Sequence, residues 1–256
     1  MSTIITIGNF ELKWYSFLLL IAFTLGSFLI YINSKKYNLD KNKIIDLIFY
    51  LILFSVIGAR IYYVIFNIGY YIKYPIEIIK VWEGGLAIHG GIIAGILYLL
   101  YFCNKNKINI LSLTDLIVPS LAIGQAIGRW GNFFNQEAYG PIVKYEVLKG
   151  LHIPNFIING MYIDNHYHYP TFLFESIWCF LIFITIIILM KINKKSLGLY
   201  TSIYLIMYGV ERFIVESLRQ DSLMFFNLKI AQIVSIIMII IGIFIQIKGR
   251  RKKIDK

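Results

Sequence analysis

Seven apolar stretches of 18 to 23 residues alternate with shorter polar segments along the chain. A helix needs about 20 apolar residues to cross the hydrocarbon core of a bilayer. Backbone groups in lipid must bond within their own segment, so these stretches are predicted to be helices rather than strands. The sequence therefore predicts an all-α integral membrane protein with about seven transmembrane helices. They are expected at approximately residues 14–32, 44–66, 84–102, 111–128, 171–190, 197–215 and 230–247.

The composition favours the same class of protein. Of the 256 residues, 58% are hydrophobic and 15% are charged, whereas globular domains carry roughly 25% charged residues. A chain with so much apolar surface needs lipid around it. The first apolar stretch lacks a basic start and a small-residue cleavage site, so it is expected to be retained. Because the chain has no internal repeat and no linker, residues 1–256 are predicted to form a single membrane domain.

The formal net charge of +11 comes from short basic clusters between the apolar stretches, a pattern of membrane topology rather than of nucleic-acid binding. Fifteen of the 25 lysines and arginines lie in the loops after the first, third and fifth stretches and in the C-terminal tail, and nine lie on the opposite side. The positive-inside rule then places the N-terminus outside and the C-terminus in the cytoplasm. The longest connection, residues 129–169, is predicted to form a small extracytoplasmic cap of turns and short strands.

Cysteine and histidine give little sign of redox or metal chemistry. Cys103 and Cys179 fall in different apolar stretches and are interpreted as packing residues rather than as a disulfide. His166 and His168 have no cysteine or carboxylate cluster at ligand spacing around them, so a metal site there is not favoured. No P-loop, Gly-x-Ser-x-Gly elbow or His-Glu-x-x-His sequence occurs.

Polar residues at membrane depth are costly and are therefore candidates for function. The first group surrounds His89, which stands between two glycine pairs where the third predicted helix begins. An imidazole can accept a proton near neutral pH. The alternative is a helix-packing surface of glycines with a structural histidine. The sequence leaves both interpretations open.

The second group occupies residues 128–140, where the fourth predicted helix ends. Arg129 offers a planar fork of donors for a phosphate, and Asn132 and Asn135 can bond glycerol hydroxyls or ester carbonyls. Glu137 and Gly140 complete the group. An interfacial turn with an aromatic belt is the alternative interpretation.

The third group lies at the outer end of the sixth predicted helix. Tyr208, Arg212, Glu216 and Arg219 share one stripe of that helix, and Glu211 lies beside it. Two arginines that alternate with a carboxylate can hold a phosphate while the carboxylate orients them. The alternative is a structural ladder of ion pairs that closes the end of the helix.

Other polar positions give weaker signals. Tyr15 follows Trp14 at the start of the first stretch and by itself fits an aromatic belt. Arg60 and Asp46 in the second stretch are expected to pair with other helices rather than to contact a substrate. Glu175 lies in the fifth stretch and needs a buried partner. The same holds for Asp115 and Gln125.

Several of these motifs resemble one known family. Residues 128–140 match the Gly-Arg-x-Gly-Asn-Phe-x-Asn-x-Glu-x-x-Gly pattern of the prolipoprotein diacylglyceryl transferases at every fixed position. His89-Gly90-Gly91 resembles the His-Gly-Gly motif of that family. The segment from Tyr208 to Arg219 resembles its late Tyr/Arg/Glu segment, and Trp14-Tyr15 and Gly58-Ala59-Arg60 follow in the expected order. The resemblance covers nearly the whole chain, although Phe174 and Ala87 replace the residues that are common in the family.

The resemblance implies a multi-pass transferase of the bacterial inner (cytoplasmic) membrane. It implies transfer of a diacylglyceryl group from phosphatidylglycerol to the lipobox cysteine of a prolipoprotein, which forms a thioether and releases glycerol phosphate. This is the first step of lipoprotein maturation, and it needs no cofactor and no metal. A small transporter or channel and a phospholipid-binding structural protein are the rival interpretations. The polar residues gather on one side of the membrane, which disfavours a conduction path.

The reaction needs proton removal from a thiol and stabilisation of a departing phosphate. We expect His89, Arg129 and Arg212 to be the catalytic residues, with the histidine taking the proton and the arginines clamping the phosphate. The remaining candidates are expected to bind or position the substrate. They are Tyr15, Asn132, Asn135, Glu137, Gly140, Tyr208, Glu216 and Arg219. This hypothesis requires the distant segments to converge near the outer leaflet.

Overall fold

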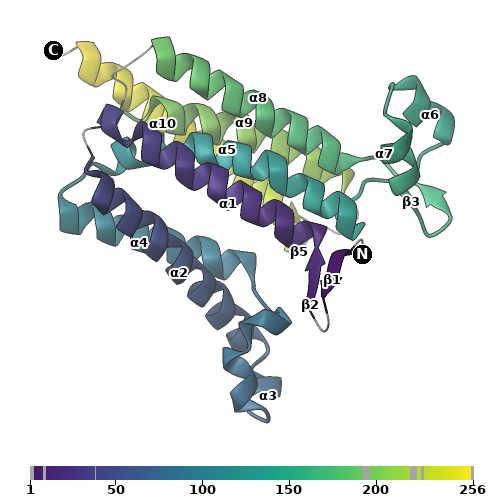
Figure 1. Cartoon of the computed structure of the whole chain (residues 1–256). Helices are drawn as coiled ribbons and strands as arrows, with labels where there is room; N and C mark the ends of the chain where they lie inside the picture. The colour runs from purple at the N-terminus through teal and green to yellow at the C-terminus, as the bar shows by residue number, and fades with distance from the viewer. Residues whose placement is uncertain are drawn as a thin grey trace. The chain divides into compact units, whose positions relative to one another are not determined.

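The structure is a computed structural model that describes residues 3–7, 10–37, 39–192, 197–219, 224–225 and 228–254. It is mostly helical and divides into two compact units, which are described separately. The larger unit comprises Met1–Ile30 and Thr114–Lys256, and the smaller one comprises Tyr31–Leu113. Figure 1 shows the helices and strands of both units with their labels.

Five long helices run through the larger unit. They are α1 (Trp14–Asn33), α5 (Ile110–Asn135), α8 (Thr171–Ile192), α9 (Leu199–Leu218) and α10 (Ile230–Ile254). Helix α9 packs against both α8 and α10. The close approach to α10 depends on Gly209, because a Cβ atom there would lie 2.9 Å from the Ser235 carbonyl oxygen. This unit also contains short antiparallel hairpins, among them β1 (Thr3–Ile7) with β2 (Phe10–Lys13) and β5 (Met224–Phe225) with β6 (Leu228–Lys229).

Asp115 explains why α9 begins where it does. This buried residue of α5 accepts hydrogen bonds from the backbone N–H of Gly198 at 2.7 Å and of Thr201 at 2.8 Å. The carboxylate therefore caps α9 from a different helix, where unpaired N–H groups and the helix dipole both favour an anion. Gln125 also has an internal partner, since its Oε1 accepts from the Tyr204 hydroxyl at 2.9 Å. Both polar residues thus have the partners that the sequence required.

The smaller unit is built on two helices that cross closely. It contains η1 (Ser34–Tyr37), α2 (Lys41–Phe66), α3 (Ile68–Tyr71), η2 (Pro75–Ile79), η3 (Val81–Glu83) and α4 (Ile88–Asn106). A Cβ atom added at Gly90 of α4 would lie 2.3 Å from the carbonyl oxygen of Gly58 in α2. Small residues let the two backbones meet at this point. The glycines of His-Gly-Gly and Gly-Ala-Arg are therefore helix-packing residues.

Arg60 ties the end of α2 to the segment before α4. Its guanidinium donates to the carbonyl oxygens of Ile78 at 2.9 Å, Gly84 at 2.8 Å and Gly85 at 3.0 Å. Such bonds to backbone carbonyls hold an irregular segment in place. Arg60 therefore has structural partners, but they are backbone carbonyls of the segment before α4 rather than side chains of another long helix.

A small cap lies between α5 and α8 in the chain. It contains α6 (Tyr145–Gly150), α7 (Asn155–Gly160) and a hairpin of β3 (Tyr162–Ile163) with β4 (His166–Tyr167). Its core is formed by buried side chains that include Leu148, Ile158 and Phe172. The sequence predicted the turns and short strands of this segment and missed its two short helices. Their length of six residues each leaves little periodicity to detect.

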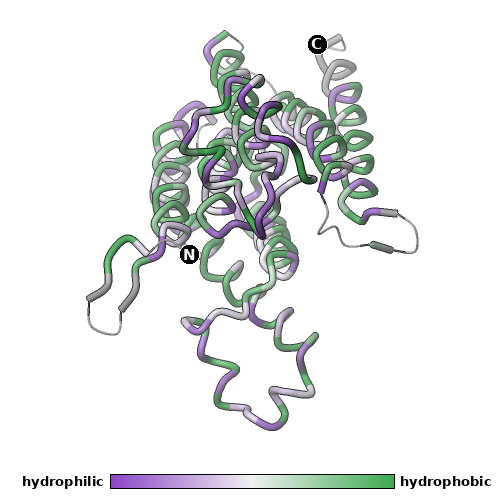
Figure 2. Tube along the Cα trace, turned by 90° about the vertical axis from the view of Figure 1, so that its right-hand side faces the viewer, coloured by the Kyte–Doolittle hydropathy of each residue, from purple (hydrophilic) through white to green (hydrophobic). Residues whose placement is uncertain are grey.

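Six of the long helices in the described residues are long and apolar enough to cross a membrane. These candidate spans are Trp14–Tyr37, Lys41–Phe66, Ile88–Asn106, Ile110–Asn135, Thr171–Ile192 and Ile230–Lys248. Helix α9 is the seventh predicted span, and it differs because it carries Glu211, Arg212 and Glu216. Figure 2 shows long hydrophobic tracts along the helical tube. The prediction of a helical membrane protein with about seven spans is confirmed.

Several predicted boundaries differ from the structure, and two of them bear on the candidate site. Helix α4 begins at Ile88 rather than at residue 84, because Gly84 (φ 96°) and Gly85 (φ 70°) adopt left-handed backbone conformations outside the helix. Helix α5 continues to Asn135 rather than ending at residue 128. The beginning of the segment predicted as a cap, residues 129–135, is therefore helical, and Arg129 lies within α5.

Candidate active site

A single buried carboxylate joins two arginines from different helices. Glu175 of α8 is 1% exposed. Its Oε2 lies 3.1 Å from Nη1 of Arg129 in α5, and its Oε1 lies 2.8 Å from Nη1 of Arg212 in α9. Three segments that are far apart in sequence therefore meet at one point in the larger unit. The partner that Glu175 required is a pair of arginines, both already candidates for phosphate binding.

Arg212 makes a second ion pair within its own helix. Its Nη2 lies 2.6 Å from Oε2 of Glu216, one turn further along α9. Glu216 is 2% exposed, so this pair is also shielded from water. One pair of the ladder considered from the sequence, Arg212 with Glu216, is present, and Glu175 extends it across helices. We call Arg129, Glu175, Arg212 and Glu216 the arginine cluster.

Arg129 keeps donor capacity in this arrangement. A guanidinium carries five N–H donors. Within the residues that the structure describes, the polar contact of Arg129 is its ion pair with Glu175. Glu175 therefore orients this arginine without saturating it. The remaining donors suit a phosphate, which guanidinium groups bind through two parallel hydrogen bonds.

The chain turns back against the last turn of α5 directly after Asn135. Glu137 Oε1 accepts from Asn132 Nδ2 at 2.9 Å and from Asn135 Nδ2 at 3.3 Å. The fold-back needs Gln136 (φ 52°) and Ala138 (φ 58°) in the left-handed region. Asn132 lies one turn after Arg129, so both project from the same face of α5. The structure thus brings most of the second sequence group together.

Gly140 has a packing role just after this turn. Its N–H donates to the Tyr169 carbonyl at 2.9 Å, and a Cβ atom there would lie 2.9 Å from Tyr169 Cβ. A larger residue would push the two strands of backbone apart. The carbonyl oxygen of Gly140 contacts Nδ1 of buried His168 at 2.9 Å. Within the described residues no group of three or more histidines, cysteines and carboxylates is placed to hold a metal ion.

Tyr15 lies against the last turns of α5. A Cβ atom at Gly131 would come within 2.5 Å of Tyr15 Cδ2, so the glycine makes room for the ring. The neighbouring Trp14 stacks on Phe134 with ring centroids 4.9 Å apart. The start of α1 is therefore fixed beside the Asn132–Glu137 turn, although the role of Tyr15 in binding stays a prediction.

The aromatic residues of α9 extend the cluster. Tyr208 lies one turn before Arg212 and stacks on Tyr204 at 5.6 Å between ring centroids. Arg219 is the C-cap of α9, and its carbonyl oxygen accepts from Lys229 Nζ at 2.9 Å. Its side chain stands about two turns beyond Arg212, near the predicted outer end of the helix.

His89 belongs to the smaller unit. It is the second residue of α4, its side chain is exposed, and its ring centroid lies 6.1 Å from that of Tyr62. The structure therefore groups Arg129 and Arg212 in one unit and describes His89 in the other. A catalytic role for His89 stays a prediction.

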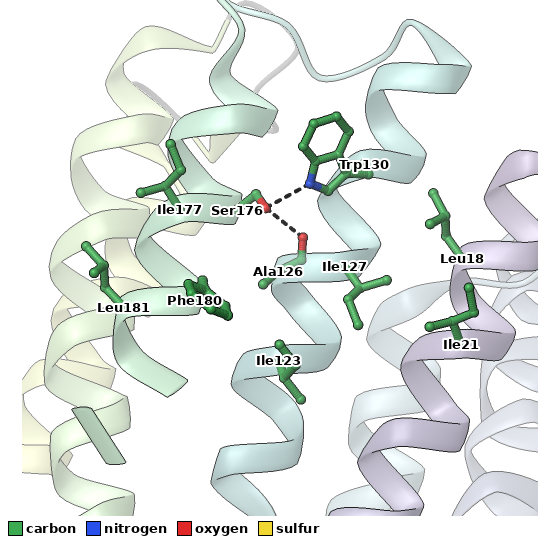
Figure 3. Close-up of a pocket in the computed structure, with 10 residues that line it drawn as sticks. All are labelled: Leu18, Ile21, Ile123, Ala126, Ile127, Trp130, Ser176, Ile177, Phe180 and Leu181. Atoms are coloured by element: carbon green, nitrogen blue, oxygen red, sulfur yellow. Dashed lines mark hydrogen bonds between the residues drawn. The ribbon is translucent and has the colours of Figure 1, made fainter. Parts of the chain in front are cut away.

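An apolar groove lies in the same unit as the arginine cluster. Its volume is about 510 Å³, and the side chains that line it come from α1, α5 and α8 (Figure 3). At one place the wall is polar, where Trp130 Nε1 donates to Ser176 Oγ at 3.2 Å and Ser176 Oγ donates to the Ala126 carbonyl at 2.8 Å. Trp130 and Ser176 directly follow Arg129 and Glu175 in the chain, and consecutive residues of a helix point in different directions, so the groove and the ion pair lie on different faces of α5 and α8.

Sequence reasoning missed this groove. Its other lining residues are Leu18, Ile21, Ile123, Ile127, Ile177, Phe180 and Leu181. In a membrane helix such residues look the same whether they face a neighbouring helix, a groove or lipid. No local pattern distinguishes these three environments.

The fold and the site define a class of protein. Charged side chains inside a multi-pass helical protein mark a functional site. Here an arginine with spare donors suits an anionic head group, and an apolar groove in the same unit suits hydrocarbon chains. The chain is therefore a polytopic membrane protein that acts on an anionic lipid.

Sequence comparison identifies the family. The family description "Prolipoprotein diacylglyceryl transferase" matches residues 2–248. The chain belongs to this family of membrane transferases of lipoprotein biosynthesis, and the resemblance noted from its motifs is confirmed.

Three bacterial relatives illustrate the similarity. The phosphatidylglycerol–prolipoprotein diacylglyceryl transferase of Staphylococcus saprophyticus is 45% identical over 247 residues, which are 96% of this chain and 88% of that protein. The corresponding protein of Clostridium novyi is 46% identical over 248 residues, 96% of this chain and 95% of its own. That of Bacillus velezensis is 42% identical over 247 residues, 96% and 91%. These relatives are Gram-positive, so the membrane that holds this multi-pass protein is the cytoplasmic one.

Proposed function

We infer that this chain transfers the diacylglyceryl group of phosphatidylglycerol to the thiol of the lipobox cysteine of prolipoproteins. The reaction forms a thioether and releases glycerol phosphate. The observation that carries the site assignment is the arginine cluster, in which Glu175 holds Arg129 and Arg212 together. Family membership over residues 2–248 supports the same reaction.

The chemistry requires two kinds of assistance. The sulfur of the cysteine forms a bond to the glyceryl carbon while the bond from that carbon to the phosphate oxygen breaks. The leaving phosphate gains negative charge, which fixed cationic donors stabilise better than water does because they need no reorganisation. The thiol must also lose its proton, since the thiolate is the nucleophile. Arg129 and Arg212 serve the first need, and His89 is the proposed proton acceptor.

The remaining residues position the lipid. Asn132, Asn135 and Glu137 form a hydrogen-bonded turn one to two helical turns beyond Arg129, at a place suited to the glycerol head. Tyr15 and Tyr208 shape the sides of the site. Glu216 orients Arg212, and Arg219 adds positive charge toward the outer end of α9. Gly140 keeps the turn compact.

The orientation follows from the basic residues. Fifteen lysines and arginines lie on the side that includes the C-terminal tail, against nine on the other. The N-terminus is therefore outside, the tail is cytoplasmic, and the cap lies on the outer surface. This arrangement puts the outer ends of α5 and α9, which hold the candidate residues, at the outer leaflet.

A double-label assay tests the function. Membranes that contain the protein are supplied with a lipobox peptide and phosphatidylglycerol labelled separately in its acyl chains and in its phosphate. The acyl label is expected on the cysteine of the peptide, and the phosphate label is expected in soluble glycerol phosphate. A peptide with serine in place of the cysteine serves as the control. Acyl label that stays in lipid, or phosphate label on the peptide, would contradict the proposal.

A further inference from the structure

Glu211 is a buried carboxyl that the proposed chemistry does not use. It lies on α9 directly before Arg212 and is 4% exposed. Within the part of the chain that the structure describes, neither Oε1 nor Oε2 of Glu211 has a hydrogen-bond partner. The other two carboxylates beside the arginines, Glu175 and Glu216, each lie within 3.1 Å of an arginine nitrogen. Glu211 is thus the carboxyl of this region without such a pair.

The surroundings of Glu211 are charged on several sides. It interacts electrostatically with Arg129 of α5, Glu175 of α8 and Arg212 of α9. Cys179 of α8 and Tyr208 of α9 also interact with it. Helix α10 packs on α9. The titratable side chains described on α10 or next to it are Lys229, just before its first residue, and Lys248, near its C-terminal end. Lys229 donates to backbone carbonyls at the end of α9.

The charge balance of the cluster depends on this residue. Arg129 and Arg212 contribute two positive charges, and Glu175 and Glu216 contribute two negative ones. With Glu211 neutral the group carries no net charge, and with Glu211 ionised its net charge is minus one. A phosphate diester arrives with one negative charge of its own. An ionised Glu211 would therefore oppose the anion that the arginines are placed to attract.

We propose that Glu211 is a proton-holding residue of the arginine cluster, neutral when the anionic phosphate binds and inhibitory when it loses its proton. This inference rests on the proposed function. The buried position supports it, because a carboxylate without hydrogen bonds is strongly disfavoured in a low-dielectric site, whereas the protonated form is tolerated. Glu211 acts through the arginines, and both of its oxygens are shielded from the groove and from water. Glu211 is therefore a positioning residue that acts on the arginines through its charge and not by contact with the substrate.

The test is the pH profile of transfer by the wild type and by Glu211→Gln. Glutamine reproduces the neutral carboxyl and cannot ionise. As pH rises, Glu211 of the wild type loses its proton and the KM for phosphatidylglycerol rises, while that of Glu211→Gln does not. For a charge about 10 Å from the phosphate at an effective dielectric of about 20, the KM difference at alkaline pH is roughly tenfold. Ionisation of the thiol affects both proteins equally and cancels in their ratio.

Two further variants make the test decisive. Glu211→Leu removes the ionisable group without preserving its polarity and is expected to share the flat KM profile of Glu211→Gln. Glu211→Asp retains a carboxyl and is expected to keep the alkaline rise. Glu146→Gln, on the exposed surface of α6, is the matched control and should follow the wild type.

The possible outcomes separate this inference from the proposed function. A wild type that transfers label and a KM ratio that rises with pH support both. If the wild type transfers label but the ratio of its KM to that of Glu211→Gln is constant between about pH 6 and about pH 9, the role of Glu211 is overturned and the proposed function stays intact. No transfer by the wild type at any pH overturns the proposed function itself.

Discussion

Replacement of Glu175 by glutamine tests the central arrangement of the site. The change keeps the size of the side chain and removes the one charge that contacts both arginines. Arg129 and Arg212 are then no longer oriented by a common anion, and Glu216 alone offsets their mutual repulsion in this buried part of the protein. We expect transfer to fall strongly while the protein still inserts into the membrane.

The magnitude follows from the two contacts. At 3.1 and 2.8 Å, each pair has a Coulomb energy of about 5–6 kcal/mol at an effective dielectric of about 20. Desolvation offsets part of this energy, and breaking a buried pair typically costs about 3–5 kcal/mol. If about 3 kcal/mol of this loss appears in the transition state, the rate of transfer falls roughly 150-fold.

The assay measures initial rates of acyl-label transfer to the lipobox peptide at several lipid concentrations. Glu175→Asp keeps the charge and should recover part of the rate, and Glu146→Gln provides a surface control. Protein amount in the membrane fraction corrects for folding losses. A Glu175→Gln enzyme within about threefold of the wild-type rate, an effect of under 1 kcal/mol, would refute the idea that this carboxylate organises the site.

Three other predictions concern single residues. Arg129→Ala should lower the transfer rate at least about 100-fold, and Arg129→Lys should recover only part of it because a lysine offers no planar fork; equal rates for the two variants would contradict a phosphate clamp. Gly90→Ala should lower the amount of folded protein by about 1–3 kcal/mol of stability through its clash with the Gly58 carbonyl, whereas Gly124→Ala, which meets no atom within 4 Å, should not; similar detergent-melting curves for both would argue against close helix packing. Arg60→Ala should open the segment before α4 to protease, measured as the rate of cleavage between residues 72 and 87, because its backbone carbonyls lose their donors; unchanged cleavage would disprove that role.

The roles of the glycine-rich motifs illustrate what the structure adds. His89 and the glycines after it looked like one functional group in the sequence. In the structure Gly90 meets Gly58 across α2 and α4, while the His89 side chain is exposed and its ring lies near that of Tyr62 in α2. The motif therefore combines a helix-packing element with a candidate proton acceptor, and the packing element fixes where the histidine stands.

The sequence alone was sufficient for the class of the protein. Apolar stretches of about 20 residues can only be helices in lipid, since every backbone group must be satisfied within its own segment. The same physics makes buried polar residues rare, so Arg129, Glu175 and Arg212 stood out without any structure. The motif around Arg129 was long enough to indicate the family.

The tertiary structure decided which of these residues meet. Glu175 needed a partner, but only the packing of α5, α8 and α9 showed that it has two. The sequence also put the end of α5 at residue 128 rather than at Asn135, because the aromatic and polar residues there resemble a membrane-surface turn. Contacts between segments separated by tens of residues depend on helix rotation and crossing, which local periodicity does not encode. Hence the nature of the protein could be derived from its chain, whereas the arginine cluster and the apolar groove are properties of the fold.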